Sequence, residues 1–156
     1  MQRTLVIAKP DAVQRQLVGR IIARFEDKGL KLVALKMLTL TLPQARRMYA
    51  VHKGKEFYER LIVFMTSGPV VAMVLEGNEA ISVVRGLVGP TFGPDAPAGT
   101  IRGDYGLSRR YNLVHASDSP AAVRRETPVF FTRRELAGYD LAATRWILDL
   151  TTGKPI

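Results

Sequence analysis

Residues 70–75 read Val-Val-Ala-Met-Val-Leu, and this run decides the fold. Six consecutive apolar residues without a charge are typical of a central strand that is covered on both faces. The run follows Ser67-Gly68-Pro69, which ends the preceding helical pattern, and it precedes a helical pattern over residues 78–88. The sequence therefore predicts a sheet with this strand in its middle and a helix directly after it.

Three other stretches predict strands. Residues 4–8 (TLVIA) are β-branched and apolar, residues 30–42 alternate apolar and polar side chains in places, and residues 129–131 form a short apolar run after Pro128. Helical spacing and helix-ending residues predict five helices, over 18–28 (ended by Gly29), 44–51 (after Pro43), 56–65, 78–88 (ended by Gly89-Pro90) and from Ser119-Pro120 to about 126.

The order of these elements predicts an α+β protein of the ferredoxin-like class. In this class a split β-α-β arrangement gives a four-stranded antiparallel sheet covered by helices. A doubly wound parallel sheet is the alternative, but no strand-to-helix turn carries the glycine-rich phosphate loop of many such folds. Residues 90–106 are rich in Pro and Gly and predict a long ordered loop, which is usually functional in a compact domain.

Composition predicts one domain over residues 1–156, with residues 133–156 as a C-terminal arm that contains a helical turn at 141–147. The chain has no cysteine, which excludes disulfides and thiolate metal sites. No targeting segment or membrane span is recognisable, and we expect a cytoplasmic location without membrane contact. The net charge of +9, from 23 Lys and Arg against 14 Asp and Glu, favours anionic partners: nucleotides, nucleic acid or acidic surfaces.

The usual phosphate-binding motifs are absent. The chain contains no G-x-x-x-x-G-K-[ST], no G-x-G-x-x-G and no protein-kinase motif set. Two distant histidines and no cysteine argue against a zinc site. If the chain handles phosphate, it must use cationic side chains and a nucleophile rather than a backbone cradle.

Two segments supply such groups. His115 lies in Asn-Leu-Val-His-Ala-Ser-Asp-Ser (112–119), and a neutral imidazole is a good nucleophile near pH 7. Arg102 lies in a Gly-flanked turn, where it can clamp phosphate with two hydrogen bonds. Taken alone, however, the histidine can equally be an inert residue at a strand end, and Asp104 can equally pair with Arg102 structurally.

Four blocks of the sequence carry a family resemblance: TLVIAKPDAV, SGPVVAMVLEG, GTIRGDYG and NLVHASDS. The chain resembles nucleoside diphosphate kinases from Arg3 to about Trp146 without a gap. The last two blocks in this order are highly specific for that family. The resemblance implies an enzyme that transfers the γ-phosphate of a nucleoside triphosphate to a nucleoside diphosphate in a ping-pong mechanism with Mg²⁺.

The resemblance also implies roles for individual residues. His115 aligns with the histidine that becomes phosphorylated, and Ser117 and Glu126 align with the groups that orient it. Tyr49 matches a tyrosine beside the transferred phosphate, and Asp118 matches an aspartate that lies near the magnesium ion, through water, in the family pattern.

The remaining matches concern nucleotide binding. Lys9 and Asn112 correspond to the pair that contacts the ribose and phosphate side of the nucleotide. Arg85, Thr91 and Arg102 correspond to the phosphate clamp. Phe57 corresponds to the aromatic side chain on which the base stacks; an aromatic face grips any base without reading its edge.

The chain departs from the family pattern at several positions, none of which removes a catalytic group: residues 90–94, Arg109, Tyr111, Ala116 and Thr127-Pro128. The altered loop leaves the subunit interface open, and Arg109 is expected to modify the contact with the base. His52 is expected to be a solvated residue at a helix end.

We expect ATP and other nucleoside tri- and diphosphates as substrates. We also expect a homo-oligomer, with a hexamer favoured over a tetramer because the arm is longer than in short bacterial members. Two competing classes remain at this stage: a non-catalytic nucleotide or nucleic-acid binder on the same fold, and a structural partner protein. Nucleic-acid binding is expected to be secondary.

Overall fold

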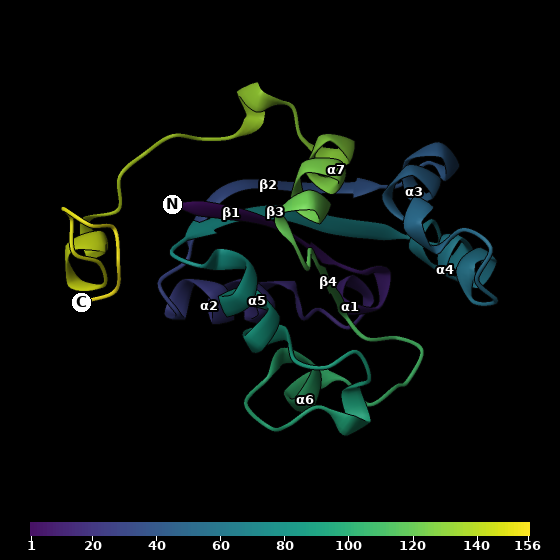
Figure 1. The fold of residues 1–156 in the computed structure, drawn as a ribbon. Coiled ribbons are helices and arrows are strands. Elements are labelled where there is room, and N and C mark those ends of the chain that lie inside the picture. The colour runs from purple at the N-terminus through teal and green to yellow at the C-terminus, as the bar shows by residue number, and fades with distance from the viewer.

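The computed structural model describes all 156 residues and contains one four-stranded sheet with helices on both faces (Figure 1). The strands are β1 (Gln2–Ala8), β2 (Lys31–Thr39), β3 (Pro69–Gly77) and β4 (Val114–Ala116). They lie in the order β2-β3-β1-β4, and each neighbouring pair is antiparallel. The predicted central run 70–75 lies inside β3, between β2 and β1, which confirms its place in the sheet.

The helices connect the strands as the ferredoxin-like class requires. A helical segment joins β1 to β2, another joins β3 to β4, and the resulting β-α-β-β-α-β order confirms the predicted fold class. The α-helices are α1 (Pro10–Gln14), α2 (Val18–Asp27), α3 (Leu42–Met48), α4 (Tyr58–Met65), α5 (Ala80–Val88), α6 (Ile101–Tyr105) and α7 (Pro120–Phe130). The 3₁₀ turns are η1 (Ala50–His52), η2 (Gly93–Asp95), η3 (Arg133–Glu135) and η4 (Ala142–Trp146).

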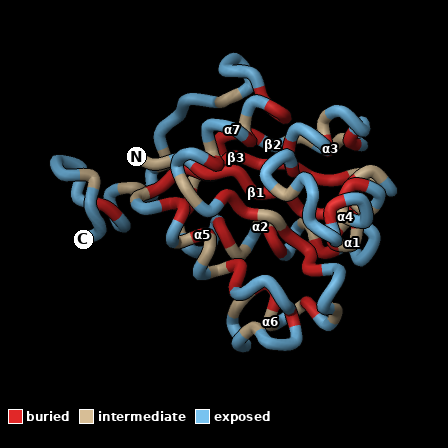
Figure 2. The backbone as a smooth tube through the Cα atoms, turned by 45° about the vertical axis from the view of Figure 1, so that its right-hand side comes forward, coloured by how far each residue is buried: buried red, intermediate tan, exposed pale blue.

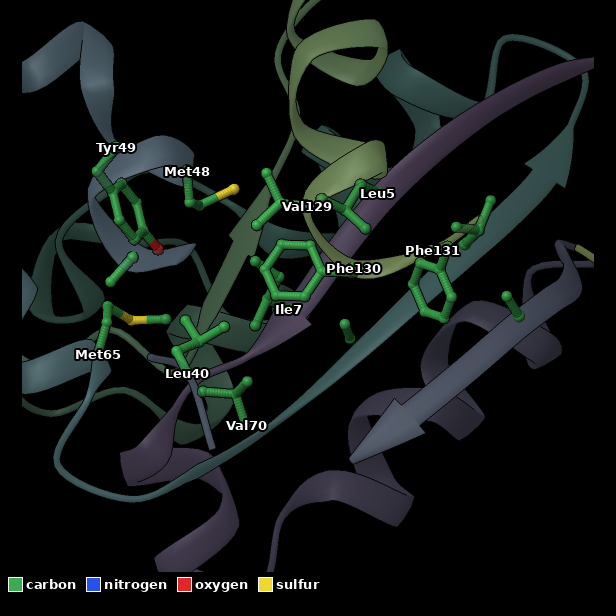
Figure 3. Close-up of a cluster of buried hydrophobic side chains, with 14 of the residues drawn as sticks. Leu5, Ile7, Leu40, Met48, Tyr49, Met65, Val70, Val129, Phe130 and Phe131 are labelled. Carbon is green, nitrogen blue, oxygen red and sulfur yellow. The ribbon is translucent and has the colours of Figure 1, made fainter. Parts of the chain in front are cut away.

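Alternation along the strands divides the core into two layers. In β1, Leu5 and Ile7 pack beneath α3, α4 and α7, whereas Val6 and Ala8 pack against α2 and α5. Figure 3 shows the first layer, with Phe130 of α7 beside Leu5 and Ile7. Both central strands are therefore buried on both faces, and the buried track in Figure 2 follows them through the molecule.

One predicted strand is wrong, and another was not predicted. Val129 and Phe130 form the end of α7 and Phe131 is its C-cap, so the helix runs past Pro128 instead of ending near Glu126. Their apolar side chains pack into the core beneath α7, and this burial outweighs the helix-breaking tendency of the proline. Pro128 is exposed, so the carbonyl that lacks a partner lies on the solvent side.

The fourth strand is β4 instead. It has only three residues, its middle residue is His115, and it pairs with β1 through the register Ile7↔His115. A three-residue strand is too short to show a period of two, so only the tertiary pairing reveals it.

The segment predicted as a long loop contains η2 and α6 and forms a lobe of residues 89–111 below the sheet (Figure 1). Close backbone packing holds this lobe: a Cβ added at Gly93 would lie 2.4 Å from the carbonyl oxygen of Gly106. Arg24 of α2 anchors the lobe through Asp104, at 2.6 Å, and through the carbonyl of Gly99. Asp104 therefore pairs with Arg24 and not with Arg102, which removes the alternative in which Asp104 holds Arg102 structurally.

The segment between β2 and β3 is a pair of short helices. The side chains of Thr41 and Gln44 form a capping box at the start of α3, which ends at Met48 before the 3₁₀ turn η1. The next helix, α4, begins at Tyr58 rather than at Glu56. Tyr49 and Phe57 consequently occupy the C-cap of α3 and the N-cap of α4, at the two ends of the connection between the helices.

The arm, residues 133–156, leaves α7 and passes the open side of β2 (Figure 1). Ala137 N–H donates to the carbonyl of Val33, and the Tyr139 hydroxyl donates to the carbonyl of Leu32 at 2.5 Å. The helical turn predicted at 141–147 is present as η4. No helix of the chain has both the length and the apolar composition to cross a bilayer.

Candidate active site

A cavity of about 1090 Å³ opens between the α3–α4 pair, the lobe and the end of β4. Its walls contain ten of the eleven residues to which the resemblance assigns a role: Lys9, Tyr49, Phe57, Arg85, Thr91, Arg102, Asn112, His115, Asp118 and Glu126. The eleventh, Ser117, lies behind the wall and is hydrogen-bonded to Glu126. The fold thus gathers into one pocket residues that are spread over more than a hundred positions of the chain.

His115 is placed by β4, with its side chain 20% exposed at the pocket wall. Its Nε2 atom lies 2.8 Å from Oε2 of Glu126, which α7 carries across the same face of the sheet. An ionised carboxylate can only accept hydrogen bonds, so Nε2 holds the proton of the neutral ring. The Nδ1 atom therefore keeps its lone pair, as a nucleophile requires.

Glu126 is fixed on three sides. Besides His115, its Oε2 accepts a hydrogen bond from Ser117 Oγ at 2.7 Å, and its Oε1 accepts one from Arg125 at 2.8 Å. Burial of Glu126 raises the pKa of its carboxyl, but the bonds from His115 and Ser117 and the charge of Arg125 outweigh it and lower the pKa below the ordinary value. Glu126 is thus ionised at neutral pH and orients the imidazole.

The electrostatic surroundings keep His115 neutral. Burial is the main influence that lowers the pKa of this histidine below its ordinary value. The hydrogen bond and the charge of Glu126 oppose the lowering, whereas the nearby cations Lys9 and Arg102 add to it. At pH 7 the ring is therefore in the form that can attack an electrophile.

Tyr49 stands beside the imidazole. The two rings meet edge to face, with centroids 5.8 Å apart. The Tyr49 hydroxyl is buried and has no hydrogen-bond partner, although it belongs to a residue of the pocket wall. Burial, followed by the charge of Glu126, raises the pKa of Tyr49, so the hydroxyl remains a neutral donor. An unpaired buried hydroxyl at this place is suited to a polar ligand.

Lys9 follows β1 directly and is 8% exposed. Its Nζ donates to Oδ1 of Asn112 at 2.7 Å, and the Asn112 amide in turn donates to the carbonyl of Thr91 at 2.9 Å. Burial and the charge of Arg102 lower the pKa of Lys9 to about 8, against the opposing charge of Asp11. An anion in the pocket would stabilise the charged form.

Arg102 lies on α6 and not in a turn, and it is 4% exposed. Its guanidinium donates to four backbone carbonyls, those of Gly89, Pro90, Asn112 and Val114. Arginine has five N–H donors, so one N–H of Nη2 remains for a ligand. Burial and the neighbouring Arg85 lower the pKa of Arg102 to about 10, which leaves it charged at neutral pH.

The other predicted residues line the outer part of the pocket. Arg85 of α5 takes part in none of the ion pairs of the chain. Phe57 exposes 43% of its surface at the mouth. Asp118 is exposed next to the N-cap of α7, where its Oδ1 accepts a hydrogen bond from Ser119.

His52 lies at the end of the 3₁₀ turn η1, as predicted, and it is partly exposed. It lines the pocket between two predicted site residues, with ring centroids 6.2 Å from Tyr49 and 5.4 Å from Phe57. Burial and Lys55, whose Nζ lies 3.2 Å from its Nδ1, lower the pKa of His52. The sequence did contain a signal for this placement: His52 follows Tyr49 by three residues, and residues three apart lie on the same side of a helical segment.

Two of the family departures in the lobe, Arg109 and Tyr111, also face the pocket. Asp95 holds the Arg109 guanidinium in a bidentate pair at 2.7 and 3.0 Å, and the guanidinium carbon lies 5.8 Å from the centroid of the Phe92 ring. Tyr111 packs against Phe64 of α4 with ring centroids 4.9 Å apart. This aromatic contact joins the lobe to the α3–α4 pair across the pocket.

The pocket offers little for a protein-held metal. No group of three or more His, Cys, Asp or Glu side chains is arranged to hold an ion. Glu126 is committed to His115, Ser117 and Arg125, which leaves Asp118 as the carboxylate among the predicted site residues that is free to face a ligand. One carboxylate together with substrate phosphates and water is a common way to hold Mg²⁺.

Comparisons with known proteins agree with this geometry. A sequence model described as nucleoside diphosphate kinase matches residues 2–136. The nucleoside diphosphate kinase of Staphylothermus marinus is 60% identical over 135 residues, which cover 86% of this chain and 96% of the relative. That of Archaeoglobus fulgidus is 52% identical over 149 residues, covering 96% and 99%.

Solved structures agree as well. A halophilic nucleoside diphosphate kinase from Halobacterium salinarum, in complex with CDP, superposes with a TM-score of 0.91 at 47% identity and covers 93% of this chain and 97% of its own. The enzyme from Borrelia burgdorferi, a transition-state mimic with bound vanadate and ADP, gives a TM-score of 0.86 at 38% identity, covering 91% and 94%. The chain therefore belongs to the nucleoside diphosphate kinase family.

Proposed function

We propose that the chain transfers phosphate from a nucleoside triphosphate to a nucleoside diphosphate through a covalent phosphohistidine on Nδ1 of His115. The transfer reaction follows from family membership. The observation that carries the choice of atom is the 2.8 Å contact between His115 Nε2 and Glu126, which leaves Nδ1 as the free nitrogen of a neutral ring at the pocket wall.

The reaction runs in two halves. Nδ1 attacks the γ-phosphorus, the bond between that phosphorus and the bridging oxygen breaks, and a nucleoside diphosphate leaves. A second diphosphate then enters, and an oxygen of its terminal phosphate takes the phosphoryl group as the P–N bond breaks. Glu126 supports the positive charge that develops on the ring at the first step, because its carboxylate already accepts the Nε2 proton.

The cations of the pocket supply the charge stabilisation that phosphoryl transfer needs. Lys9, Arg85 and Arg102 face the site and oppose the charge of the phosphates. At about 4 Å and an effective dielectric near 20, each such pair is worth on the order of 4 kcal/mol before desolvation. Thr91 completes the clamp, and the unpaired Tyr49 hydroxyl donates to the transferred group.

The outer pocket takes the nucleoside. Phe57 presents its exposed face at the mouth, where a base can stack on it. Asn112, already bonded to Lys9, contacts the ribose side. A stacking contact is tolerant of the base, so ATP and other nucleoside tri- and diphosphates are substrates under this proposal.

Mg²⁺ is the proposed cofactor, and the donor set fits it. Asp118 would face the ion through water, and the substrate phosphates would supply the other charged oxygens. When bound, the ion neutralises charge on the β- and γ-phosphate oxygens.

A labelling experiment tests the carrier. Incubation with γ-labelled ATP and Mg²⁺ is expected to give a protein-bound phosphate that is labile in acid and stable in base. His115→Asn is expected to abolish the label, whereas His52→Gln, at the only other histidine, is expected to keep it. Absence of label in the unmodified protein, or its persistence in His115→Asn, would refute the carrier role.

A non-catalytic nucleotide or nucleic-acid binder is not favoured, because a binder has no need of an oriented, neutral imidazole. Secondary binding of nucleic acid rests on the +9 charge alone. A steep loss of DNA affinity with salt would support that role, and no binding at low salt would remove it.

We also propose a homo-oligomer, with six copies favoured over four, and a cytoplasmic location where nucleoside triphosphates are available. The exposed apolar side chains of the edge strand β2 support assembly: Leu35 is 51% exposed and Met37 is 61% exposed. Cell fractionation tests the location: the chain is expected in the fraction that contains the nucleoside triphosphates.

A further inference from the structure

The chain makes a strained reverse turn between Asn112 and His115. The N–H of Val114 donates to the carbonyl of Asn112 at 2.7 Å, which closes a three-residue turn centred on Leu113. Leu113 has a φ of +68°, and a γ-turn with positive φ is rare and strained for a residue with a side chain. The two other non-glycine residues with positive φ, Gln16 and Glu79, are exposed, whereas Leu113 is fully buried.

The segment that follows β1 forms hydrogen bonds with both the N–H and the carbonyl of Leu113. The N–H of Leu113 donates to Oδ2 of Asp11 at 3.0 Å, and its carbonyl accepts the N–H of Lys9 at 2.8 Å. Asp11 lies in the first turn of α1. It does not line the cavity, so it cannot touch a ligand there.

The residues on both sides of this turn contact or carry the reactive groups of the pocket. On one side, Asn112 reaches Lys9 Nζ with its side chain and Arg102 Nε with its carbonyl. On the other side, the carbonyl of Val114 accepts from Arg102 Nη2, and His115 follows at once. A relaxed backbone at Leu113 would therefore move the imidazole and the cations relative to each other.

We propose that Asp11 is a positioning residue for the phosphoryl transfer, which holds the strained turn at Leu113 so that His115 and Asn112 keep their reactive geometry. The strain of such a turn and a hydrogen bond to a partly buried carboxylate are similar in size, so loss of the carboxylate frees the turn to relax. The inference rests on the proposed carrier role of His115.

An electrostatic role is the alternative. The negative charge of Asp11 raises the pKa of Lys9 and of Arg102, so Asp11 also acts as a counter-charge. Asp11→Asn separates the two roles, because an amide oxygen can accept the Leu113 N–H without carrying charge. Asp11→Ala removes both the acceptor and the charge.

The decisive experiment places these substitutions in three backgrounds: unmodified, Leu113→Gly and Leu113→Ala. Glycine adopts positive φ without strain, whereas alanine removes a similar part of the packing but keeps its Cβ. The readout is the rate at which His115 takes the phosphate in a single turnover, measured well below the melting temperature. The ¹⁵N shifts of the His115 ring without nucleotide give a second readout.

In the unmodified background, Asp11→Ala is expected to slow phosphorylation about 10-fold or more, and Asp11→Asn no more than about 3-fold. The loss caused by Asp11→Ala is expected to shrink to about 3-fold or less with Leu113→Gly and to persist with Leu113→Ala. The ring shifts are expected to move towards a mixture of tautomers in Asp11→Ala only, which a purely structural role would not cause.

Equal losses in the glycine and alanine backgrounds would overturn the proposal, and so would an Asp11→Asn variant as slow as Asp11→Ala. If the double variants do not fold, the ring shifts of the two Asp11 variants decide: unchanged shifts in Asp11→Ala refute the positioning role. Failure of the carrier role would look different, because the unmodified protein would then take no label while the ring shifts still reported on Asp11.

Discussion

At the scale of single residues, the Glu126–His115 pair is expected to control both the speed and the pH dependence of the proposed phosphoryl transfer. Neutral His115 is the attacking form in that proposal, and burial of the ring lowers its pKa below the ordinary histidine value of about 6.5. The rate of phosphorylation is therefore expected to stay level through neutral pH and to fall only in more acidic solution. A single-turnover pH profile measures this, and a fall that begins above pH 7 would contradict it.

Glu126→Gln should change that profile in a specific direction. The hydrogen bond and charge of Glu126 raise the His115 pKa against the effect of burial, so their loss shifts the acidic limb to still lower pH. The level part of the profile is expected to drop about 10-fold or more, because a charge-assisted hydrogen bond to the ring is lost. A lower plateau with an unshifted limb would mean that the carboxylate does not act on the ring.

Lys9 makes nucleotide binding depend on protons. Its pKa is lowered to about 8, so in the empty pocket it loses its proton as the pH rises through 8. Bound phosphate favours the charged form, so binding above pH 8 should take up a proton, and affinity should weaken as pH rises further. Calorimetry at pH 8.5 in two buffers of different ionisation enthalpy measures the uptake, and Lys9→Gln is expected to lack that proton.

The residues of the site were largely identified by the resemblance, and the pocket brings together what the sequence keeps apart. Chemistry alone left His115 and Arg102 ambiguous, because a single residue does not show its partners. Arg102 bonds four carbonyls that belong to the end of α5, the lobe and β4, which no local pattern indicates. His52 was missed because its neighbours Tyr49 and Phe57 reach it only through the bend between α3 and α4.

At the scale of elements, long periodic segments were predictable and short or context-dependent ones were not. Apolar residues recur at regular spacing in β1, α2, β3 and α5 because each of these elements buries fixed faces in the core. This regular spacing is visible in the sequence. Residues 129–131 look like a strand because they are β-branched and aromatic, yet Val129 and Phe130 end α7 and Phe131 is its C-cap, all three buried. Strand β4 exists because β1 offers it a partner, and α6 exists because Thr100 caps it inside the lobe.

Two glycines at the beginning and the end of α2 should respond oppositely to alanine. Gly29 has a φ of +86°, and an added Cβ would lie 2.7 Å from Cδ1 of Ile147 in the arm. Gly29→Ala is expected to lower the free energy of unfolding by about 1 kcal/mol or more, because positive φ is strained for alanine. Gly19 has open space around it, so Gly19→Ala is expected to raise that free energy by up to about 0.5 kcal/mol.

Denaturant unfolding of the two variants beside the unmodified chain measures both changes. The comparison is matched, because each variant adds one methyl group at α2 or at its end. Equal destabilisation by both substitutions would show that the backbone conformation at Gly29 and its contact with the arm do not matter.

At the scale of the whole molecule, the free edge of the sheet is the proposed contact between copies. The order β2-β3-β1-β4 leaves one side of β2 unpaired, and such an edge can pair with another chain. The arm covers the first part of this edge through its bonds to Leu32 and Val33. Leu35 and Met37 remain exposed beyond it, which points to this part of β2 as the contact between copies.

Lysine side chains at this part of β2 should therefore reduce the number of copies in the assembly. Light scattering is expected to give about six times the 17.3 kDa chain mass for the unmodified protein. The double variant Leu35→Lys with Met37→Lys is expected to give a smaller multiple, because unpaired charges buried at an interface are energetically costly. Leu42→Lys, which places the same charge at a residue 52% exposed at the start of α3, is the control and should keep the full mass. An unchanged mass in the β2 variant would exclude this edge, and the contact would then have to lie on the lobe or the arm.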